Sequence, residues 1–255
     1  MRRSVVALAR RALVNALRRP QFLAPLVLFP SLFLAINVGG LGATRQLEGF
    51  PAVDGFLDYQ LAAAIVQSLL IGGVTAGIAA ALDIEGGFFD RLVASPTPRI
   101  AIVLGRVLAA SVIAFFQVVY FLLLGLVFGA SIKGGVLGVA CVLAIGVVAG
   151  TGFGAIGVLI ALRARNASTV QGIFPLVFVV LFISSAFFPL DLLSAPADVI
   201  ARYNPLSFIA EGLRQPIAFS NKAGPVIEGL LAAASIAAVS IGLSLLALRG
   251  RLRRA

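Results

Sequence analysis

Side chains that could carry out chemistry are few in this chain. Histidine is absent, and the single cysteine, Cys141, lies within an apolar run. Histidine metal sites, Ser–His or Cys–His nucleophile pairs and histidine proton relays are therefore excluded. The G-x-x-x-x-G-K-[ST] phosphate loop is also absent, so the chain cannot itself be a P-loop ATPase. We expect no catalytic residue, metal ligand or bound cofactor on this chain, and we do not expect it to be an enzyme.

The segment 83–99 concentrates polar and aromatic residues. Its spacing predicts a short helix over 88–94, with an apolar ridge of two phenylalanines, a leucine and a valine suited to docking into a partner's groove. After it, Thr97 is expected to cap a long helix that starts at Pro98 and carries Arg99 and Arg106 out of the hydrocarbon. The candidate contact residues are Glu85, Gly87, Phe88, Phe89, Asp90, Arg91, Leu92, Ser95, Pro96 and Arg99.

A second polar segment precedes the last apolar run. Asn204 can cap a helix that begins at Pro205, and Glu211 and Arg214 are spaced so that they can form an ion pair. A simple surface loop is the alternative. The candidate residues here are Asn204, Pro205, Ser207, Glu211 and Arg214.

Composition indicates what must position these segments. The 255 residues are 60% hydrophobic and 12% charged, with a mean hydropathy of +1.09, whereas a soluble domain carries about 25% charged residues. A soluble protein is therefore excluded. Six apolar stretches can cross a bilayer as helices, which predicts an all-α polytopic membrane protein with one transmembrane domain. The expected spans are 22–38, 59–82, 98–130, 136–162, 170–190 and 226–248, with a loop at 83–97 and another at 191–224.

The net charge of +10 is unevenly placed. Of the 20 Lys and Arg residues, 15 fall on the side of the two termini, so the positive-inside rule places both termini in the cytoplasm. Arginine pairs within 1–20 flank an apolar helical face, which predicts an amphipathic interface helix on the anionic inner leaflet; a frayed basic tail is the alternative. We expect a lipid bilayer as partner and no nucleic acid.

The apolar spans contain no Asp, Glu, Lys or Arg near their middles, which argues against ion- or proton-driven transport. Small residues at four-residue spacing, above all Gly146, Gly150 and Gly154, predict tight helix contacts. The deeper polar side chains either bond neighbouring helices or line a translocation path. These are Gln60, Gln67, Thr75, Gln117 and Tyr120.

The two polar segments resemble signatures of one family. The first reads Glu85-x-Gly87-x-x-Asp90-Arg91-Leu92-x-x-Ser95-Pro96-x-x-Arg99, and the second reads Asn204-Pro205-Leu206-Ser207, then Glu211-x-Leu213-Arg214. In this order, and with this pattern of spans, the chain resembles ABC-2 type transporter permeases, especially the daunorubicin-resistance-like branch.

The resemblance implies the membrane subunit of an ABC exporter in a bacterial plasma membrane. Two such subunits, identical or related, would pair with two cytoplasmic ATPase subunits that hold ATP and Mg²⁺. The loop 83–99 would couple to the ATPase, and 191–224 would fold partly back into the outer leaflet. Drugs, antibiotics or lipids would be exported, with antibiotic resistance as one outcome. The alternative is a gradient-driven secondary transporter or channel.

Overall fold

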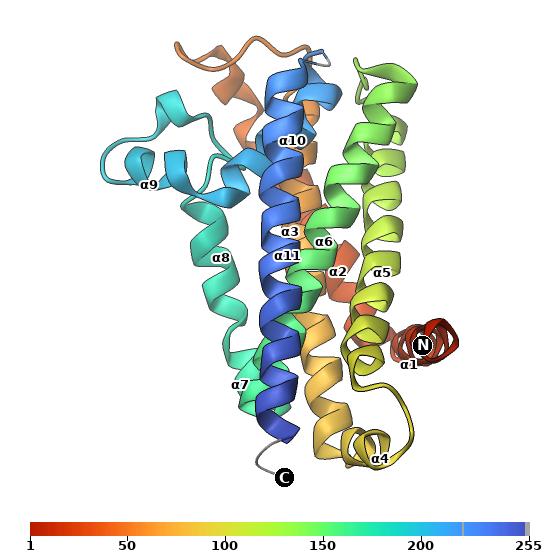
Figure 1. Ribbon diagram of the computed structural model, residues 1–255. Helices are drawn as coiled ribbons and strands as arrows, with labels where there is room; N and C mark the ends of the chain where they lie inside the picture. Colours follow the sequence, from red (N-terminus) through yellow and green to blue (C-terminus); the bar gives the residue numbers. More distant parts are fainter. Residues whose placement is uncertain (221, 253–255) are drawn as a thin grey trace.

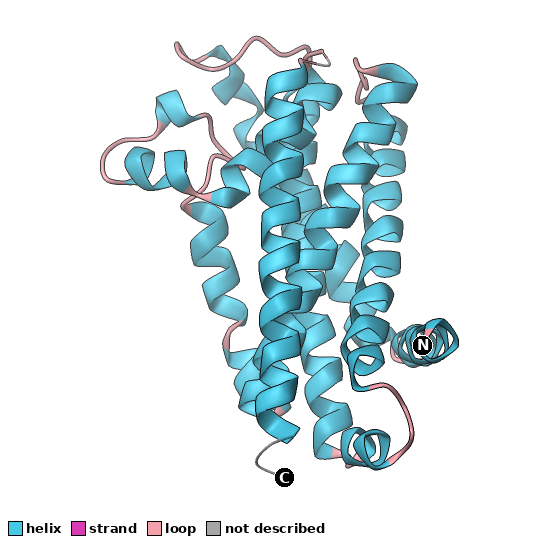
Figure 2. Cartoon of the chain, in the orientation of Figure 1, coloured by secondary structure: helices cyan, strands magenta, loops and turns pink. Residues whose placement is uncertain are grey.

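The computed structural model describes residues 1–220 and 222–252; Arg253 and Arg254 of the basic C-terminus lie outside the described residues. Every regular element in the described part of the chain is a helix (Figure 2). The elements are α1 (Arg2–Leu17), α2 (Pro20–Leu41), the 3-10 helix η1 (Gly42–Gln46), α3 (Phe56–Glu85), α4 (Phe88–Ala94), α5 (Arg99–Val127), α6 (Gly135–Ala164), α7 (Ala167–Gly172), α8 (Phe174–Phe182), the 3-10 helix η2 (Leu190–Leu192), α9 (Ala197–Tyr203), α10 (Pro205–Ala218) and α11 (Ala223–Leu252).

Five helical segments among the described residues are long and apolar enough to cross a membrane: Pro20–Gln46, Phe56–Glu85, Arg99–Val127, Gly135–Ala164 and Ala223–Gly250. The helix expected over 170–190 is not continuous. It is interrupted at Ile173 and ends at Phe182, so this apolar segment consists of the shorter helices α7 and α8. Pro175 explains the interruption, because it has no N–H to donate to the carbonyl of Gln171.

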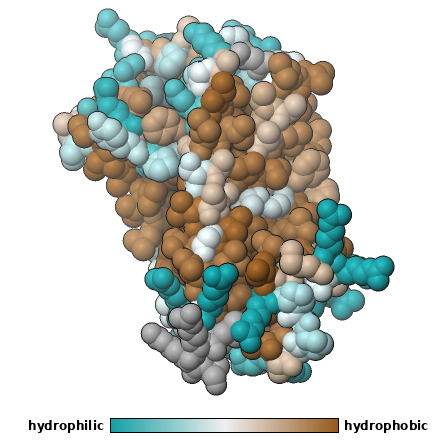
Figure 3. All heavy atoms as spheres, viewed as in Figure 1, coloured by the Kyte–Doolittle hydropathy of each residue, from teal (hydrophilic) through white to brown (hydrophobic). Residues whose placement is uncertain are grey.

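The long helices run side by side; α8 lies alongside the middle of the bundle, and the other short helices lie towards its two ends (Figure 1). Helix α1 runs across the bundle rather than along it, near the end where α4 lies and where α11 finishes. On the face drawn in Figure 3, apolar side chains cover the middle of the molecule and hydrophilic ones gather towards both ends. This distribution fits a bilayer around the middle of the bundle.

Helix α3 is the centre of the bundle. Its most apolar stretch is 67% buried, against 22% for the corresponding stretches of α2 and α11. A Cβ added to Gly73 would lie 2.6 Å from the carbonyl oxygen of Phe153, and one added to Gly77 would lie 2.8 Å from that of Gly157. Glycine is therefore required where α3 and α6 meet backbone to backbone.

The predicted glycine stripe of α6 lies against α5. A Cβ added to Gly146 would meet Val118 at 2.5 Å, and Cβ atoms on Gly150 and Gly154 would clash with Ala114 and Ala110. The tight helix contact expected from the spacing of these glycines is thereby confirmed.

A proline in α2 creates a polar link between three helices. Pro30 has no N–H, so the carbonyl of Leu26 lacks its normal helical donor. The hydroxyl of Ser68 on α3 donates to that carbonyl at 2.6 Å, and Gln117 on α5 donates to the Ser68 hydroxyl at 2.8 Å. The carbonyl that Pro30 leaves without a helical donor thus links α2 to α3 and, through Ser68, to α5.

Candidate functional site

Helix α4 forms where the sequence places it, over Phe88–Ala94. It is preceded by Gly87, whose φ of +67° is a left-handed conformation that favours glycine and turns the chain sharply after α3. It ends where Ser95 turns its hydroxyl back to the carbonyl of Leu92 at 2.7 Å, ahead of Pro96. The next long helix begins at Arg99 rather than at Pro98. Thr97 does not cap it; its hydroxyl oxygen instead accepts a bond from Ser95.

The apolar ridge of α4 faces its own protein, which corrects the expectation that it docks into a partner. Phe89 is 3% exposed and belongs to a cluster formed with residues of α3, α5, α6, α7 and α11, and Leu92 and Val93 pack on that cluster. A short helix can bury only one face, and its own bundle already covers the apolar one. The exposed side carries Asp90, Arg91 and Ala94. The exposed residues that α4 offers to a partner are therefore mainly polar, beside the partly exposed Phe88, Leu92 and Val93.

Glu85 joins the end of α3 to the start of α7. Its carboxylate accepts the backbone N–H of Ala167 at 2.9 Å, beside Asn166, whose side chain caps the same helix by accepting the N–H of Thr169. A carboxylate at a helix N-terminus is favourable because it faces unpaired N–H groups and the positive end of the helix dipole. Glu85 is thus committed to an internal contact.

An ion cluster beside α4 was not predicted as a site. Asp83, in the last turn of α3, accepts hydrogen bonds from Arg11 of α1 at 3.0 and 3.3 Å and from Arg106 of α5 at 2.5 Å. The guanidinium of Arg11 also lies 3.3 Å from the centre of the Phe88 ring. Arg106 was expected to project outward, but its side chain is 14% exposed. One signal was available: an arginine buried in an apolar helix requires a carboxylate.

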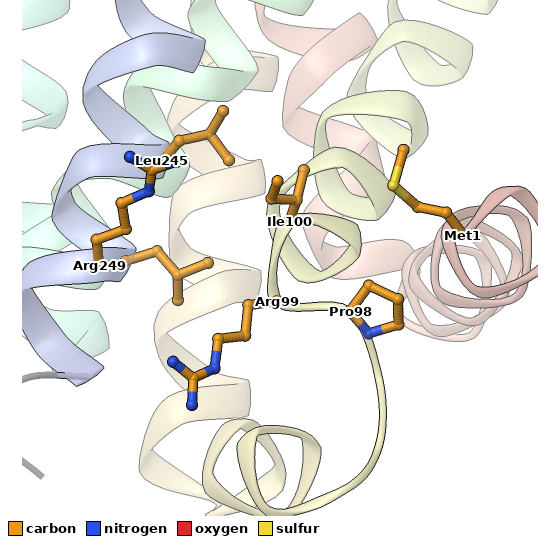
Figure 4. A pocket seen from close by; sticks show the side chains of 7 residues that line it. Met1, Pro98, Arg99, Ile100, Leu245 and Arg249 are labelled. Carbon is orange, nitrogen blue, oxygen red and sulfur yellow. The ribbon is translucent and has the colours of Figure 1, made fainter.

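Arg99 behaves differently from Arg106. It is exposed and lines a hollow of about 440 Å³ between the first turn of α5, Met1 and the last turns of α11 (Figure 4). In Figure 4 its side chain extends from the start of α5 towards α11, above the ribbon of α4. Among the predicted coupling residues, Arg99 therefore stands apart from the contacts that hold α4.

At the opposite end, Arg214 of α10 organises the second predicted segment. It is 1% exposed and pairs with Glu211 at 2.8 Å, as its spacing predicts. It also donates to the carbonyl oxygens of Ser185 and Ala186 at 3.1 and 2.6 Å, and its guanidinium stacks 3.8 Å from the ring centre of Tyr59. These carbonyls lie in the irregular segment after α8, where no helical N–H group can pair with them. Arg214 supplies their hydrogen-bond donors.

Asn204 and Ser207 complete this Arg214 cluster. The Asn204 side chain caps α10 by accepting the N–H of Leu206, as predicted, and donates to the carbonyls of Val180 and Ile183 at the end of α8. The Ser207 hydroxyl accepts the N–H of Ser185 at 3.0 Å. Pro205, at the first position of α10, needs no donor there. A hollow of about 320 Å³ opens beside Tyr59, Ser207, Glu211 and Arg214.

Most of the polar residues within the spans bond to neighbouring groups. Gln60 donates to the carbonyl of Phe187, Tyr120 shares a bond with Ser31, and Thr75 bonds its own helix at Ile71. Gln117 belongs to the Ser68 link already described. Gln67 differs, because it is fully buried and neither its Nε2 nor its Oε1 has a partner. No group of three or more His, Cys, Asp or Glu side chains in the described part of the chain could hold a metal ion.

The fold and these two segments define a multi-pass membrane protein with polar clusters at both ends of an apolar bundle. The family model described as "ABC-2 type transporter" matches residues 3–217, which include both polar segments. The chain belongs to the ABC-2 type transporter family. Membership of the daunorubicin-resistance-like branch is a finer statement that this match does not make.

Two curated relatives carry the same printed name, "Putative transport permease ycf38". The relative from Cyanophora paradoxa is 26% identical over 212 residues, which cover 81% of this chain and 71% of the relative. The relative from Porphyra purpurea is 26% identical over 218 residues, covering 82% of this chain and 72% of the relative. The chain is a membrane transport permease of this family.

Proposed function

We propose that this chain is the membrane subunit of an ATP-driven exporter that couples to a separate cytoplasmic ATPase through the exposed polar edge of α4. The observation that best supports this proposal is the position of α4 in a chain of this family. It is a short helix beyond the end of the long helices, with Asp90, Arg91 and Ala94 exposed and with Phe89 anchored in the bundle. A helix that is anchored in the bundle and exposes a polar edge can transmit a displacement caused by a soluble partner to the spans.

In the proposed topology the end that holds α4 is cytoplasmic, and so are both termini. Helices α7 and α8 and the residues up to Phe187 provide a sixth crossing, and the 191–224 segment, with α9 and α10, folds partly back into the outer leaflet. Helix α1 lies on the inner leaflet with its arginines towards anionic lipid. The charge distribution supports this orientation in a bacterial plasma membrane.

The proposed substrates are amphipathic small molecules, namely drugs, antibiotics or lipids, in line with the daunorubicin-resistance-like branch. A row of aromatic rings supports this class: Phe29 and Phe33 of α2 pack edge to face with Phe178 and Phe182 of α8. Two of these rings, Phe29 and Phe182, are exposed in the single chain. Two permease chains, identical or related, would enclose such a surface with their two ATPase subunits.

The experiment pairs the purified chain with a candidate P-loop ATPase subunit from the same genome. Inside-out vesicles containing both proteins should accumulate a fluorescent amphipathic probe, doxorubicin or an NBD-labelled phospholipid, when ATP and Mg²⁺ are added. Failure to form a complex, together with no ATP-dependent accumulation of either probe, would overturn the proposal. Flux that needs no ATPase and follows an imposed ion gradient would instead support the gradient-driven alternative.

Asp90→Ala and Arg91→Ala should test the coupling edge. Because both side chains are exposed, the variants should insert and melt as the parent does, but ATP-dependent probe transport should fall about tenfold if each removes roughly 1.4 kcal/mol of coupling. Glu48→Ala, an exposed acidic residue at the other end, is the matched control and should transport normally. Unchanged transport in both α4 variants would remove this edge from the mechanism.

A further inference from the structure

The Asp83 cluster joins four helices at one point. Asp83 lies at the end of α3, Arg11 in the middle of α1, Arg106 in the first turns of α5, and Phe88 begins α4. Both arginines reach the same carboxylate oxygen, Oδ2, at 3.0 and 2.5 Å, and Arg11 reaches Oδ1 as well. A single acidic side chain therefore holds groups from two other helices, and through Arg11 it also reaches α4.

The surroundings of the cluster make these contacts stronger than ordinary surface pairs. The side chains of Arg106, Asp83 and Arg11 are 14%, 21% and 36% exposed. Arg11 lies between the carboxylate and the Phe88 ring, which combines an ion pair with a cation–π contact. Partly buried charges interact more strongly than exposed ones because less water screens them.

Close packing also holds α1 against α5, the helix that carries Arg106. A Cβ added to Gly105 would lie 2.7 Å from the Cβ of Leu8 and 3.2 Å from the carbonyl oxygen of Val5, so α1 rests directly on the backbone of α5. One helical position further on, Arg106 turns to Asp83. The contact between α1 and α5 and the ion cluster therefore brace each other.

We infer that Asp83 is a positioning residue that makes α1, α4 and the first turns of α5 move as one unit, so that a displacement of α4 also moves the N-terminal helix. The role in transport rests on the proposed coupling at α4, but the mechanical unit does not. Because α1 runs across the bundle, it transmits the displacement of this unit away from the bundle axis and towards the membrane surface.

The mechanical unit can be tested without an ATPase. With Cys141→Ala as background, spin labels at Ala7→Cys and Ala94→Cys report the distance between α1 and α4 in lipid nanodiscs, because both residues are exposed. The parent should give one narrow distribution. Asp83→Asn should broaden it about twofold, since the attraction that fixes Arg11 is lost while packing remains. Asp83→Glu should restore the narrow form.

Two further variants separate the contact of Arg11 from that of Arg106 and control for misfolding. Arg11→Gln removes the link of α1 to Asp83 and Phe88 but leaves Arg106 paired, so it should broaden the distribution as Asp83→Asn does. Asp54→Asn breaks the exposed Lys133–Asp54 pair at the opposite end and should leave it narrow. A distribution that stays narrow in folded Asp83→Asn and Arg11→Gln protein would overturn the inference.

The complete transporter then tests the transmission. A third label at Ala238→Cys on α11 serves as reference, and its distances to Ala7→Cys and Ala94→Cys are measured before and after ATP and vanadate are added. Because Ala94 lies on the proposed coupling edge, only a labelled complex that retains ATP-dependent transport is used. In the parent both distances should shift, whereas in Asp83→Asn only the α4 distance should. If α4 shifts in the parent but α1 does not, the inference fails and the proposed function stands. If α4 does not shift in a competent complex, the proposed coupling fails.

Discussion

The two ends of the bundle each hold an arginine cluster, but the clusters are built differently. At the end that holds α10, Arg214 is 1% exposed and donates mainly to backbone carbonyls, at Ser185, Ala186 and Tyr59. At the end that holds α4, Arg11 and Arg106 both bind one side chain, Asp83, which is 21% exposed. The Arg214 cluster completes a chain segment that lacks helical bonds, whereas the Asp83 cluster joins separate helices that are each already complete.

The difference predicts which cluster costs more to break. Leaving buried carbonyls without donors costs more than losing a partly hydrated ion pair, because water can replace the lost partners only at the second site. The Arg214 cluster should therefore contribute more to stability, whereas the Asp83 cluster should chiefly fix the relative positions of α1, α4 and α5. Three substitutions test this contrast.

The largest effect is expected for Arg214→Leu. It leaves the buried carbonyls of Ser185 and Ala186 without this donor, which should cost about 2–6 kcal/mol and sharply reduce the amount of folded protein. Thermal melting in detergent measures the loss. Arg214→Lys keeps the charge and should retain part of the stability. If Arg214→Leu melts at the parent temperature, the Arg214 cluster does not make the larger contribution to stability.

A smaller effect is expected for Asn204→Ala. The variant loses the cap on α10 and two bonds to the end of α8, which together should cost about 1–2 kcal/mol. Hydrogen exchange should increase at residues 183–187 and at the start of α10, but not at α4. Asn166→Ala, which removes an exposed cap at the opposite end of the bundle, is the matched control. Equal exchange in the parent and Asn204→Ala would contradict the assignment.

The smallest effect on stability is expected for Asp83→Asn. The amide oxygen can still accept one arginine, so the loss should be about 1 kcal/mol. Because the cluster is partly exposed, added salt should weaken the parent and narrow the difference between parent and variant. Melting curves at low and high NaCl measure this. A loss as large as that of Arg214→Leu would show that the two clusters contribute equally to stability.

Much of the helical layout could be predicted because it depends on local pattern. Apolar runs located the five long helices, and the short helix predicted over 88–94 is α4. The cap at Asn204 and the pair Glu211–Arg214 also follow from short spacings. In each case the interacting groups are close in sequence, so the chain itself sets the geometry.

The remaining features depend on contacts between distant residues. Apolar content alone continued the helix to residue 190, but the turn after Phe182 is held by Arg214, Ser207 and Asn204, which come 20 or more residues later. Arg11 and Asp83 are 72 positions apart, and hydropathy gives no sign that they meet. The apolar ridge of α4 could not be assigned to a partner or to the bundle until α5, α6 and α11 were seen to cover it.

The link from Leu26 to Ser68 has a consequence for biosynthesis. The first span leaves the ribosome before Ser68 and Gln117 do, so it enters the bilayer with a Leu26 carbonyl that its own helix cannot pair. That carbonyl acquires its donor only when the second span arrives, and the donor is fixed only when the third span packs beside both. The first span is therefore expected to remain near the translocon until the second and third spans have been inserted.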